Sequence, residues 1–368
     1  MFRRVLVICL VLTTALPVYA ERVSSAKGSD IFLESIAVFD RPWALSFLPD
    51  QSMLVTTKRG TMYHVDRTGR HRTVEGVPEV FAGGQGGLGD VVLHPDFREN
   101  NWVYFSYVDS NDQGKTKFAR VVRAKLTLDN GPRLGEIETI WHQNSALVGQ
   151  GHYAYRLAFG PMGSDQEGML FITSGDRQAQ LPAQDMSLNL GKIIRLHDDG
   201  RLPTDNPFAT GSAISQSFWS IGHRNMLGIA FDGEGQLWAH EMGPQDGDEL
   251  NRIVPGGNYG WPIVSEGIHY NGQDIPNHST RPEFIAPSIA WVPTVAPSGL
   301  VFEGAKAWIG GLRSRALIQV DTSVQPAQEV QRYEWGRRVR DVDIDARGNL
   351  WVLEEGRQGR LIKIVREK

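Results

Sequence analysis

Five arginines are the residues whose type and spacing most directly suggest chemistry in this 368-residue sequence. They stand beside the ends of expected strands: Arg156, Arg224, Arg313, Arg338 and Arg340. If they met in one channel they would repel one another unless an anion lay between them, and the planar guanidinium group suits carboxylates. The alternative for each arginine taken singly is a surface ion pair. The set as a whole favours an anion-binding site.

Other polar residues cluster at the same strand ends. Gln85 lies among glycines, which allow the backbone to approach a bound group closely. Gly151 and His152 precede Arg156, and Asn225 follows Arg224. Further clusters occupy residues 241–249, 257–262 and 294–298. Taken alone, each is as compatible with a turn or a solvated loop as with a site.

Several familiar motifs are incomplete. Residues 84–89 fit the G-x-G-x-x-G pattern of dinucleotide binding, but residues 90–93 continue as a strand instead of opening a helix. His240 and Glu241 begin a zinc-protease motif, but position 244 is proline. Residues 246–249 are acidic without the spacing of an EF-hand loop, and no G-x-S-x-G motif is present. These patterns do not support a nucleotide, zinc-protease or serine-hydrolase site.

One phrase recurs six times along the chain: a short apolar strand, a turn rich in Pro, Asp and Gly, and a second alternating strand. The first strand and its turn fall at 45–50, 90–96, 156–161, 228–233, 299–304 and 341–346. This is the pattern of a β-hairpin, and a third strand follows at 191–196 and at 360–365.

A single such unit cannot bury both faces of its sheet, whereas six arranged radially can. The sequence therefore predicts an all-β fold, a six-bladed β-propeller with long loops inserted in the middle blades. Tandem β-sandwiches are the weaker alternative. In a propeller, ligands usually bind where loops surround the mouth of the central channel.

The N-terminus has the layout of a secretory signal peptide. Arg3 and Arg4 precede an apolar run at 5–16, and small residues end at Ala20, which predicts cleavage there and a single domain over 21–368. An uncleaved anchor is the alternative. The one cysteine, Cys9, lies in this segment, so the mature chain would contain no disulfide. We expect a periplasmic or secreted protein that is not embedded in a membrane. A net charge of -4 with no basic block argues against a nucleic-acid partner.

From residue 41 to residue 361 the sequence resembles the soluble dehydrogenases that depend on pyrroloquinoline quinone (PQQ), the glucose/sorbosone dehydrogenase family. The motifs that carry the resemblance occur in the same order: 84–88, 224–225, 241–244, 248–251, 258–262, 294–298 and 338–341. The resemblance implies a six-bladed propeller that oxidises aldose sugars at the anomeric C1 hydroxyl to the lactone, with PQQ and Ca²⁺ as cofactors. It also implies a quinone or a cytochrome as electron acceptor.

The resemblance further implies roles for individual residues. His152 would be the general base that takes the proton of the sugar's anomeric hydroxyl while hydride passes from C1 to the quinone, and Asp176 would orient His152. The residues that would contact PQQ are Gln85, Arg224, Asn225, Arg313, Arg338 and Arg340. The carbonyls of Gly243 and Pro244 would bind the calcium that ligates PQQ, whereas Glu249 and Tyr259 would bind a structural calcium.

This chain departs from the family beside the expected base. Between His152 and Arg156 the family has two glycines, but here Ala154 and Tyr155 add bulk that affects the size of the substrate. Arg313 stands where the family has a lysine, with the same charge and a different geometry.

Two other functions remain open. One is a non-catalytic propeller that binds a sugar or a protein partner. The other is a calcium-dependent hydrolase such as a lactonase, which would require carboxylates from several blades at the axis. The sequence predicts arginines there, so we rank the hydrolase last.

Overall fold

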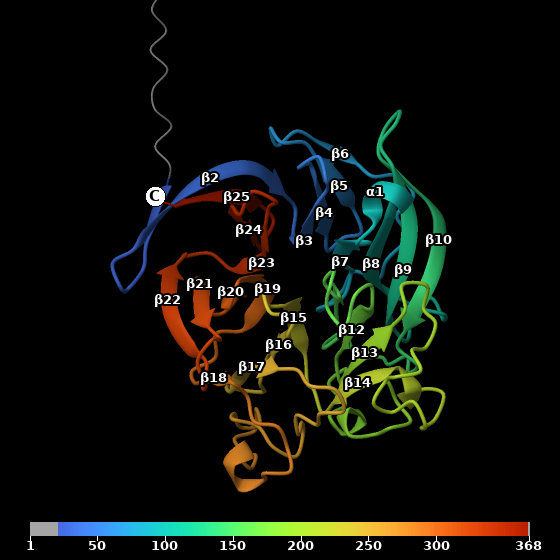
Figure 1. The fold of residues 1–368 in the computed structure, drawn as a ribbon, viewed down its shortest axis with the longest axis vertical. Helices are drawn as coiled ribbons and strands as arrows, with labels where there is room; N and C mark the ends of the chain where they lie inside the picture. Colours follow the sequence, from blue (N-terminus) through green and yellow to red (C-terminus); the bar gives the residue numbers. More distant parts are fainter. Residues whose placement is uncertain (1–20, 367–368) are drawn as a thin grey trace, which may run out of the picture.

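The computed structural model describes residues 21–366, so the signal peptide predicted for 1–20 lies outside the described residues. Six antiparallel sheets are arranged around a central axis, as Figure 1 shows. The predicted six-bladed β-propeller is thereby confirmed. Within residues 21–366 no helix is long and apolar enough to cross a membrane. The helical elements are α1 (Phe97–Asn100), η1 (Leu181–Ala183), η2 (Ser215–Ser217) and η3 (His278–Thr280).

Blades 1 to 5 are sheets of four strands, and blade 6 is a sheet of five strands. Blade 1 contains β3 (Pro42–Phe47), β4 (Met53–Thr57), β5 (Met62–Val65) and β6 (His71–Thr73). Blade 2 contains β7 (Leu88–Leu93), β8 (Trp102–Asp109), β9 (Phe118–Thr127) and β10 (Arg133–His142). Blade 3 contains β11 (Ala154–Phe159), β12 (Leu170–Ser174), β13 (Lys192–Leu196) and β14 (Phe218–Ile221).

The other three blades complete the ring. Blade 4 contains β15 (Met226–Phe231), β16 (Leu237–Glu241), β17 (Asp248–Arg252) and β18 (Ile289–Trp291). Blade 5 contains β19 (Pro297–Glu303), β20 (Lys306–Gly311), β21 (Ala316–Asp321) and β22 (Gln328–Glu334). Blade 6 contains β23 (Val339–Ile344), β24 (Leu350–Glu354), β25 (Gly359–Arg366), β2 (Asp30–Phe39) and β1 (Glu21–Ser24).

Blade 6 combines both ends of the chain. Strand β2 pairs antiparallel with β25 from Ile31 opposite Arg366 to Phe39 opposite Gly359, and β1 continues the sheet outward. This pairing closes the ring, because β25 would otherwise be an unpaired edge strand. The first predicted hairpin, which begins at 45–50, therefore belongs to blade 1, which follows the closing strand β2 along the chain.

The recurring turn has a physical basis in three of the repeats. The acid in the turn accepts a hydrogen bond from the indole of a tryptophan on the second strand: Asp232 from Trp238 (2.9 Å), Glu303 from Trp308 (3.1 Å) and Asp345 from Trp351 (3.0 Å). Asp232 and Asp345 also accept backbone N–H groups within the turn, which fixes the turn locally. The acid and the tryptophan thus bring the two strands of the hairpin together.

The innermost strand of every blade has a β-bulge near its start. The bulges fall between Pro42 and Ala44, Leu88 and Val91, Ala154 and Leu157, Met226 and Gly228, Pro297 and Leu300, and Val339 and Asp341. A bulge redirects a side chain out of the regular alternation. Side chains within these bulges, among them Trp43, Tyr155 and Arg340, line the main cavity of the axis.

An ion triad lies on the axis and was not predicted. The buried guanidinium of Arg156 bonds Asp90 (3.1 Å) and Asp341 (2.9 Å), which come from β7 and β23. Its Nε donates to the carbonyl of Leu227, and the guanidinium stacks on Trp43 at 4.2 Å. The prediction that arginines stand in place of carboxylates at the axis is therefore wrong for these blades. Because the two carboxylates are paired with Arg156, they do not form the open carboxylate site that a hydrolase would need.

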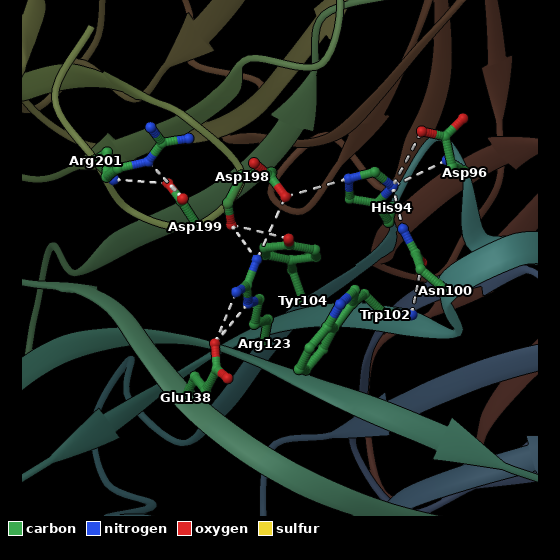
Figure 2. Close-up of polar contacts among 10 residues, drawn as sticks. All are labelled: His94, Asp96, Asn100, Trp102, Tyr104, Arg123, Glu138, Asp198, Asp199 and Arg201. Carbon is green, nitrogen blue, oxygen red and sulfur yellow. Dashed lines mark hydrogen bonds and ion pairs between the residues drawn. The ribbon is translucent and has the colours of Figure 1, made fainter.

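A polar network joins blades 2 and 3 (Figure 2). Asp198 lies in the turn after β13. Its carboxylate forms an ion pair with the guanidinium of Arg123 at 3.3 Å and lies 3.5 Å from Nε2 of His94. Arg123 also pairs with Glu138 at 2.8 Å and stacks on Trp102 at 4.5 Å. The network links a loop of blade 3 to strands of blade 2.

Arg123→Met is expected to lower the free energy of unfolding by about 1 kcal/mol, because it removes a cation–π contact and two partly exposed ion pairs. Urea denaturation measures this change. The matched control is Arg133→Met, whose partner Glu75 and own side chain are both two-thirds exposed. The control should cost less than about 0.5 kcal/mol. Equal losses in the two variants would contradict the structural role of the network.

Candidate active site

Three long loops on blades 3 and 4 supply the core of the site. The first precedes β11 and contains His152, the second follows β12 and contains Asp176, and the third follows β17 and contains Trp261. Nδ1 of His152 lies 2.7 Å from Oδ1 of Asp176, and the indole of Trp261 donates to Oδ2 at 2.8 Å. The structure thus brings together the two residues predicted as base and orienting acid.

The hydrogen bonds of Asp176 determine the state of His152. An ionised Asp176 accepts the Nδ1 proton, which leaves the lone pair on Nε2. Nε2 makes no hydrogen bond with any residue in the described range 21–366. Burial is the main cause that lowers the pKa of His152, and Arg224 and Arg177 add to it against the opposing effect of Asp176. The imidazole is therefore neutral at neutral pH, as a general base requires.

The backbone around His152 is left-handed. The φ angles of His152, Ala154 and Tyr155 are 48°, 61° and 53°. Glycine adopts this region without strain, so Ala154 and Tyr155 hold an unfavourable conformation at these positions. Tyr155 is held by packing on Trp43 (5.2 Å between ring centroids) and by a hydrogen bond from its hydroxyl to the carbonyl of Gln85 (3.2 Å).

Gln85 and Arg177 hold the loop of His152 from two sides. The side-chain oxygen of Gln85 accepts the backbone N–H of His152 at 2.7 Å. The buried Arg177 donates to the carbonyls of Gly151 and Lys117, at 2.9 and 2.7 Å, and lies 3.9 Å from the ring centre of Tyr153. Arg177 was not singled out in the sequence, because nothing there shows that its partners are backbone carbonyls.

A buried lysine supports the loop between Asp176 and β13. Nζ of Lys192 donates to the carbonyls of Pro182, Ala183 and Leu190 at 2.8 to 3.0 Å. Burial lowers the pKa of Lys192 to about 7. In the same loop, the side chain of Gln184 donates to the backbone carbonyl of Trp261 at 2.8 Å, so the loop holds the residue whose indole binds Asp176.

Lys192 makes stability depend on pH. The unfolded lysine titrates near 10.4 and the folded one near 7, so the unfolded state binds more protons between these values and stability rises with pH. The difference in unfolding free energy between wild type and Lys192→Met is expected to grow by about 1–2 kcal/mol from pH 7 to pH 9. Urea titrations at both values measure it. A constant difference would show that Lys192 is not perturbed.

The main cavity at the axis has a volume of about 270 Å³. Its wall includes Gln85, Ala154, Tyr155 and Leu227, and its charged lining residues are Lys58, Arg338, Arg340 and Glu355. Arg338 and Arg340 both donate to Glu355, and these two cations keep the pKa of Glu355 low despite its burial. Three cations and one carboxylate leave the wall with a net charge of +2.

Arg224 and Asn225 lie on the loop before β15. Arg224 donates to the carbonyl of Met242 at 2.9 Å and lies over the ring of Trp261 at 5.3 Å. Its Nε and both polar atoms of the Asn225 side chain are buried without a hydrogen-bond partner in the described structure, and so is Nε of Arg340. Buried polar groups normally have partners, so these atoms indicate where a polar ligand fits.

Of the residues predicted to contact PQQ, Gln85, Arg338 and Arg340 line the main cavity, whereas Arg224 and Asn225 lie on a loop that adjoins it. Arg313 does neither. It is exposed in the turn between β20 and β21, although its neighbour Leu312 lines the cavity. The turn is held by a hydrogen bond from its N–H to the carbonyl of Val295. Lys58, which follows β4, lines the cavity instead and was missed, because a single lysine in a turn between strands resembles a solvated surface residue.

A second, small cavity of about 10 Å³ lies beside Arg224 and is lined by Gly243, Glu249 and Tyr259, but not by Pro244. Burial and the neighbouring Glu241 raise the pKa of Glu249. Within residues 21–366 no three His, Cys, Asp or Glu side chains are grouped as a metal site, so backbone carbonyls would have to supply further ligands. The backbone carbonyl of Tyr259 already accepts a hydrogen bond from Nε2 of His278 at 3.1 Å.

Comparison with known proteins identifies the family. Residues 39–363 match a family described as glucose / sorbosone dehydrogenase. The chain is 36% identical to the aldose sugar dehydrogenase YliI of Escherichia coli (strain K12), over 88% of this chain and 90% of that protein.

Two solved structures share the fold. The crystal structure of the soluble aldose sugar dehydrogenase from Escherichia coli in the apo-form has a TM-score of 0.84 at 34% identity, covering 92% of this chain and 100% of that chain. The PQQ-bound form of an aldose sugar dehydrogenase from Streptomyces coelicolor has a TM-score of 0.74 at 28% identity, covering 92% and 98%. The match over most of the chain, together with the propeller and its site, shows that this protein belongs to the glucose/sorbosone dehydrogenase family of enzymes.

Proposed function

We propose that this protein is a PQQ-dependent dehydrogenase that oxidises aldose sugars at the anomeric C1 hydroxyl to the lactone. The observation that carries the proposal is a neutral imidazole, His152, oriented by Asp176 beside a cavity whose wall has a net charge of +2. The PQQ-bound relative from Streptomyces coelicolor supports the identity of the cofactor.

The cavity and the adjoining loop of Arg224 and Asn225 fit PQQ, which has carboxylates on its two outer rings and a quinone on its central ring. Arg338, Arg340 and the net positive wall suit carboxylates. The unpartnered Nε of Arg224 and side chain of Asn225 suit quinone oxygens. When bound, PQQ supplies an acceptor for two electrons and the hydrogen of C1. The protein then has to orient the sugar and receive the other proton.

In this proposal His152 is the catalytic base. Its Nε2 accepts the proton of the C1 hydroxyl while C1 loses a hydride, so the C–O bond becomes the carbonyl of the lactone. Asp176 stabilises the resulting imidazolium and keeps the ring in place. Trp261 fixes the second oxygen of Asp176. Arg224 and Asn225 would supply hydrogen-bond donors to the quinone oxygens of PQQ, which become more negative when the cofactor is reduced.

We also propose that Ca²⁺ activates the cofactor. Gly243 and Pro244 would supply carbonyl oxygens, and Glu249 and Tyr259 would hold a structural ion. Two observations support a cation there: the small cavity adjoins the buried Glu249, and the nearby Glu241 opposes ionisation of Glu249. A cation with a preference for oxygen ligands would stabilise both carboxylates.

The test is reconstitution of the purified protein with PQQ and Ca²⁺. We expect reduction of an artificial dye with an aldose, formation of the lactone, and loss of activity when Ca²⁺ is removed with a chelator. If PQQ binds but no aldose or other alcohol reduces the dye, the protein is a binding propeller. If PQQ does not bind, the proposed cofactor is wrong.

Export is part of the same proposal. A signal peptide cleaved after Ala20 would place the enzyme in the periplasm or outside the cell, where a quinone or a cytochrome would accept the electrons. N-terminal sequencing of protein from the periplasmic fraction should begin at Glu21. Recovery only of the uncleaved chain would contradict this localisation.

A further inference from the structure

Lys58 is a cation in the main cavity that no ion pair neutralises. It is half-buried, and its Nζ makes one hydrogen bond in the described structure, to the carbonyl of Gly84. No carboxylate lies within ion-pair distance of Nζ among residues 21–366, whereas Arg338 and Arg340 share Glu355.

The surroundings of Lys58 disfavour its charge. Burial is the main cause that lowers the pKa of Lys58, and the charges of Arg340 and Arg41 lower it further against the opposing effect of Glu355. The folded protein therefore holds the partly desolvated ammonium of Lys58 near the guanidinium of Arg340. An anion bound in the cavity would offset the repulsion between these two cations and favour the charged form of Lys58.

Arg313 cannot serve in the same way from its observed position. Its side chain is exposed in the turn between β20 and β21, and it is absent from the wall of the cavity. Lys58 lines the cavity from blade 1, where it follows β4. The cationic wall is thus built from Lys58 of blade 1 and Arg338 and Arg340 of blade 6.

We infer that Lys58 binds a carboxylate of the cofactor together with Arg338 and Arg340, and that Arg313 does not. This inference rests on the proposed function, because it takes an aromatic polycarboxylate as the ligand. The ammonium supplies up to two donors beyond its bond to Gly84, without the fixed fork of a guanidinium.

The inference is tested by equilibrium binding of PQQ to the apo-protein with Ca²⁺ present, followed by tryptophan fluorescence or calorimetry. Lys58→Met should raise the dissociation constant for PQQ about 10- to 100-fold, the loss expected for one desolvated charged hydrogen bond. Arg313→Met is the matched control and should change the dissociation constant by less than about twofold. Lys58→Arg should restore most of the affinity.

The pH dependence separates charge from structure. The wild-type affinity should fall as Lys58 loses its proton at alkaline pH, whereas Lys58→Arg should retain its affinity there. Lys58→Gln keeps a donor for Gly84 but lacks the charge, so it should bind as weakly as Lys58→Met. Lys58→Met that binds PQQ like wild type, or Arg313→Met that loses affinity, would overturn the inference.

A second probe distinguishes this inference from the proposed function. Pyridine-2,6-dicarboxylate is an aromatic dicarboxylate without a quinone. If wild type binds it in a Lys58-dependent way but does not bind PQQ, the proposed function fails and the role of Lys58 stands. If wild type binds PQQ with no dependence on Lys58, the role of Lys58 fails alone. If neither ligand binds, both are wrong.

Discussion

His152→Ala is expected to reduce kcat by about 10²- to 10⁴-fold, the usual contribution of a positioned general base. Binding of PQQ should change by less than about threefold, because His152 acts on the sugar and the net positive wall is built from other residues. Steady-state kinetics of the reconstituted enzyme and a PQQ titration measure the two effects separately.

The pH profile provides a second test of His152. Only the neutral imidazole accepts a proton, and its pKa is lowered from 6.5 mainly by burial. In the wild type, kcat/KM, which reports the ionisation of the free enzyme, should therefore stay constant from neutral pH to below pH 6.5 and fall only in more acidic solution. The control is His142→Ala, which changes an exposed histidine at the end of β10 and should leave kcat unchanged. Full activity of His152→Ala would exclude His152 as the base.

Arg156→Met is expected to destabilise the fold by about 3–5 kcal/mol, because it leaves two buried carboxylates without their shared cation. Asp90 and Asp341 accept both the guanidinium and backbone N–H groups, and burial already raises the pKa of Asp341 to about 6. Urea denaturation measures the loss.

The sign of the pH effect follows from these carboxylates. Without Arg156 the pKa values of Asp90 and Asp341 in the folded state rise further above their unfolded values, so stability is lost as the pH rises through them. The deficit against wild type should be larger at pH 8 than at pH 5. The triple variant Arg156→Met, Asp90→Asn, Asp341→Asn should recover much of the stability. A single variant that loses less than about 1 kcal/mol would contradict the role of the triad.

The propeller was predictable because each hairpin repeats the same local signals. The turn acids Asp232 and Asp345 and the tryptophans that follow them are visible in the sequence and form the observed hydrogen bonds. The strand that closes the ring was not predicted, because pairing of β2 with β25 joins residues more than three hundred positions apart. Nothing local in residues 30–39 specifies that partner.

The site was predictable where a motif fixes a residue and its partner together. His152 and Asp176 meet as the resemblance implied. Charge alone was a poor guide: Arg156 is bound to Asp90 and Asp341. Arg313 is exposed and does not line the cavity, whereas Lys58 does. A side chain's direction depends on the bulges and turns of each blade, and a count of charged residues contains no information on either.

Joining both termini in one blade has a consequence for biosynthesis. A ribosome releases β2 before blades 1 to 5 and β25 after them, so the nascent chain can stack five blades but cannot seal the circle until β25 has emerged. A circular permutant that begins at β3, with β25 linked to β1 and β2 by a new peptide connection, would make the last blade from contiguous sequence. The native order instead delays completion of the site, to which blades 1 and 6 both contribute, until β25 has been synthesised.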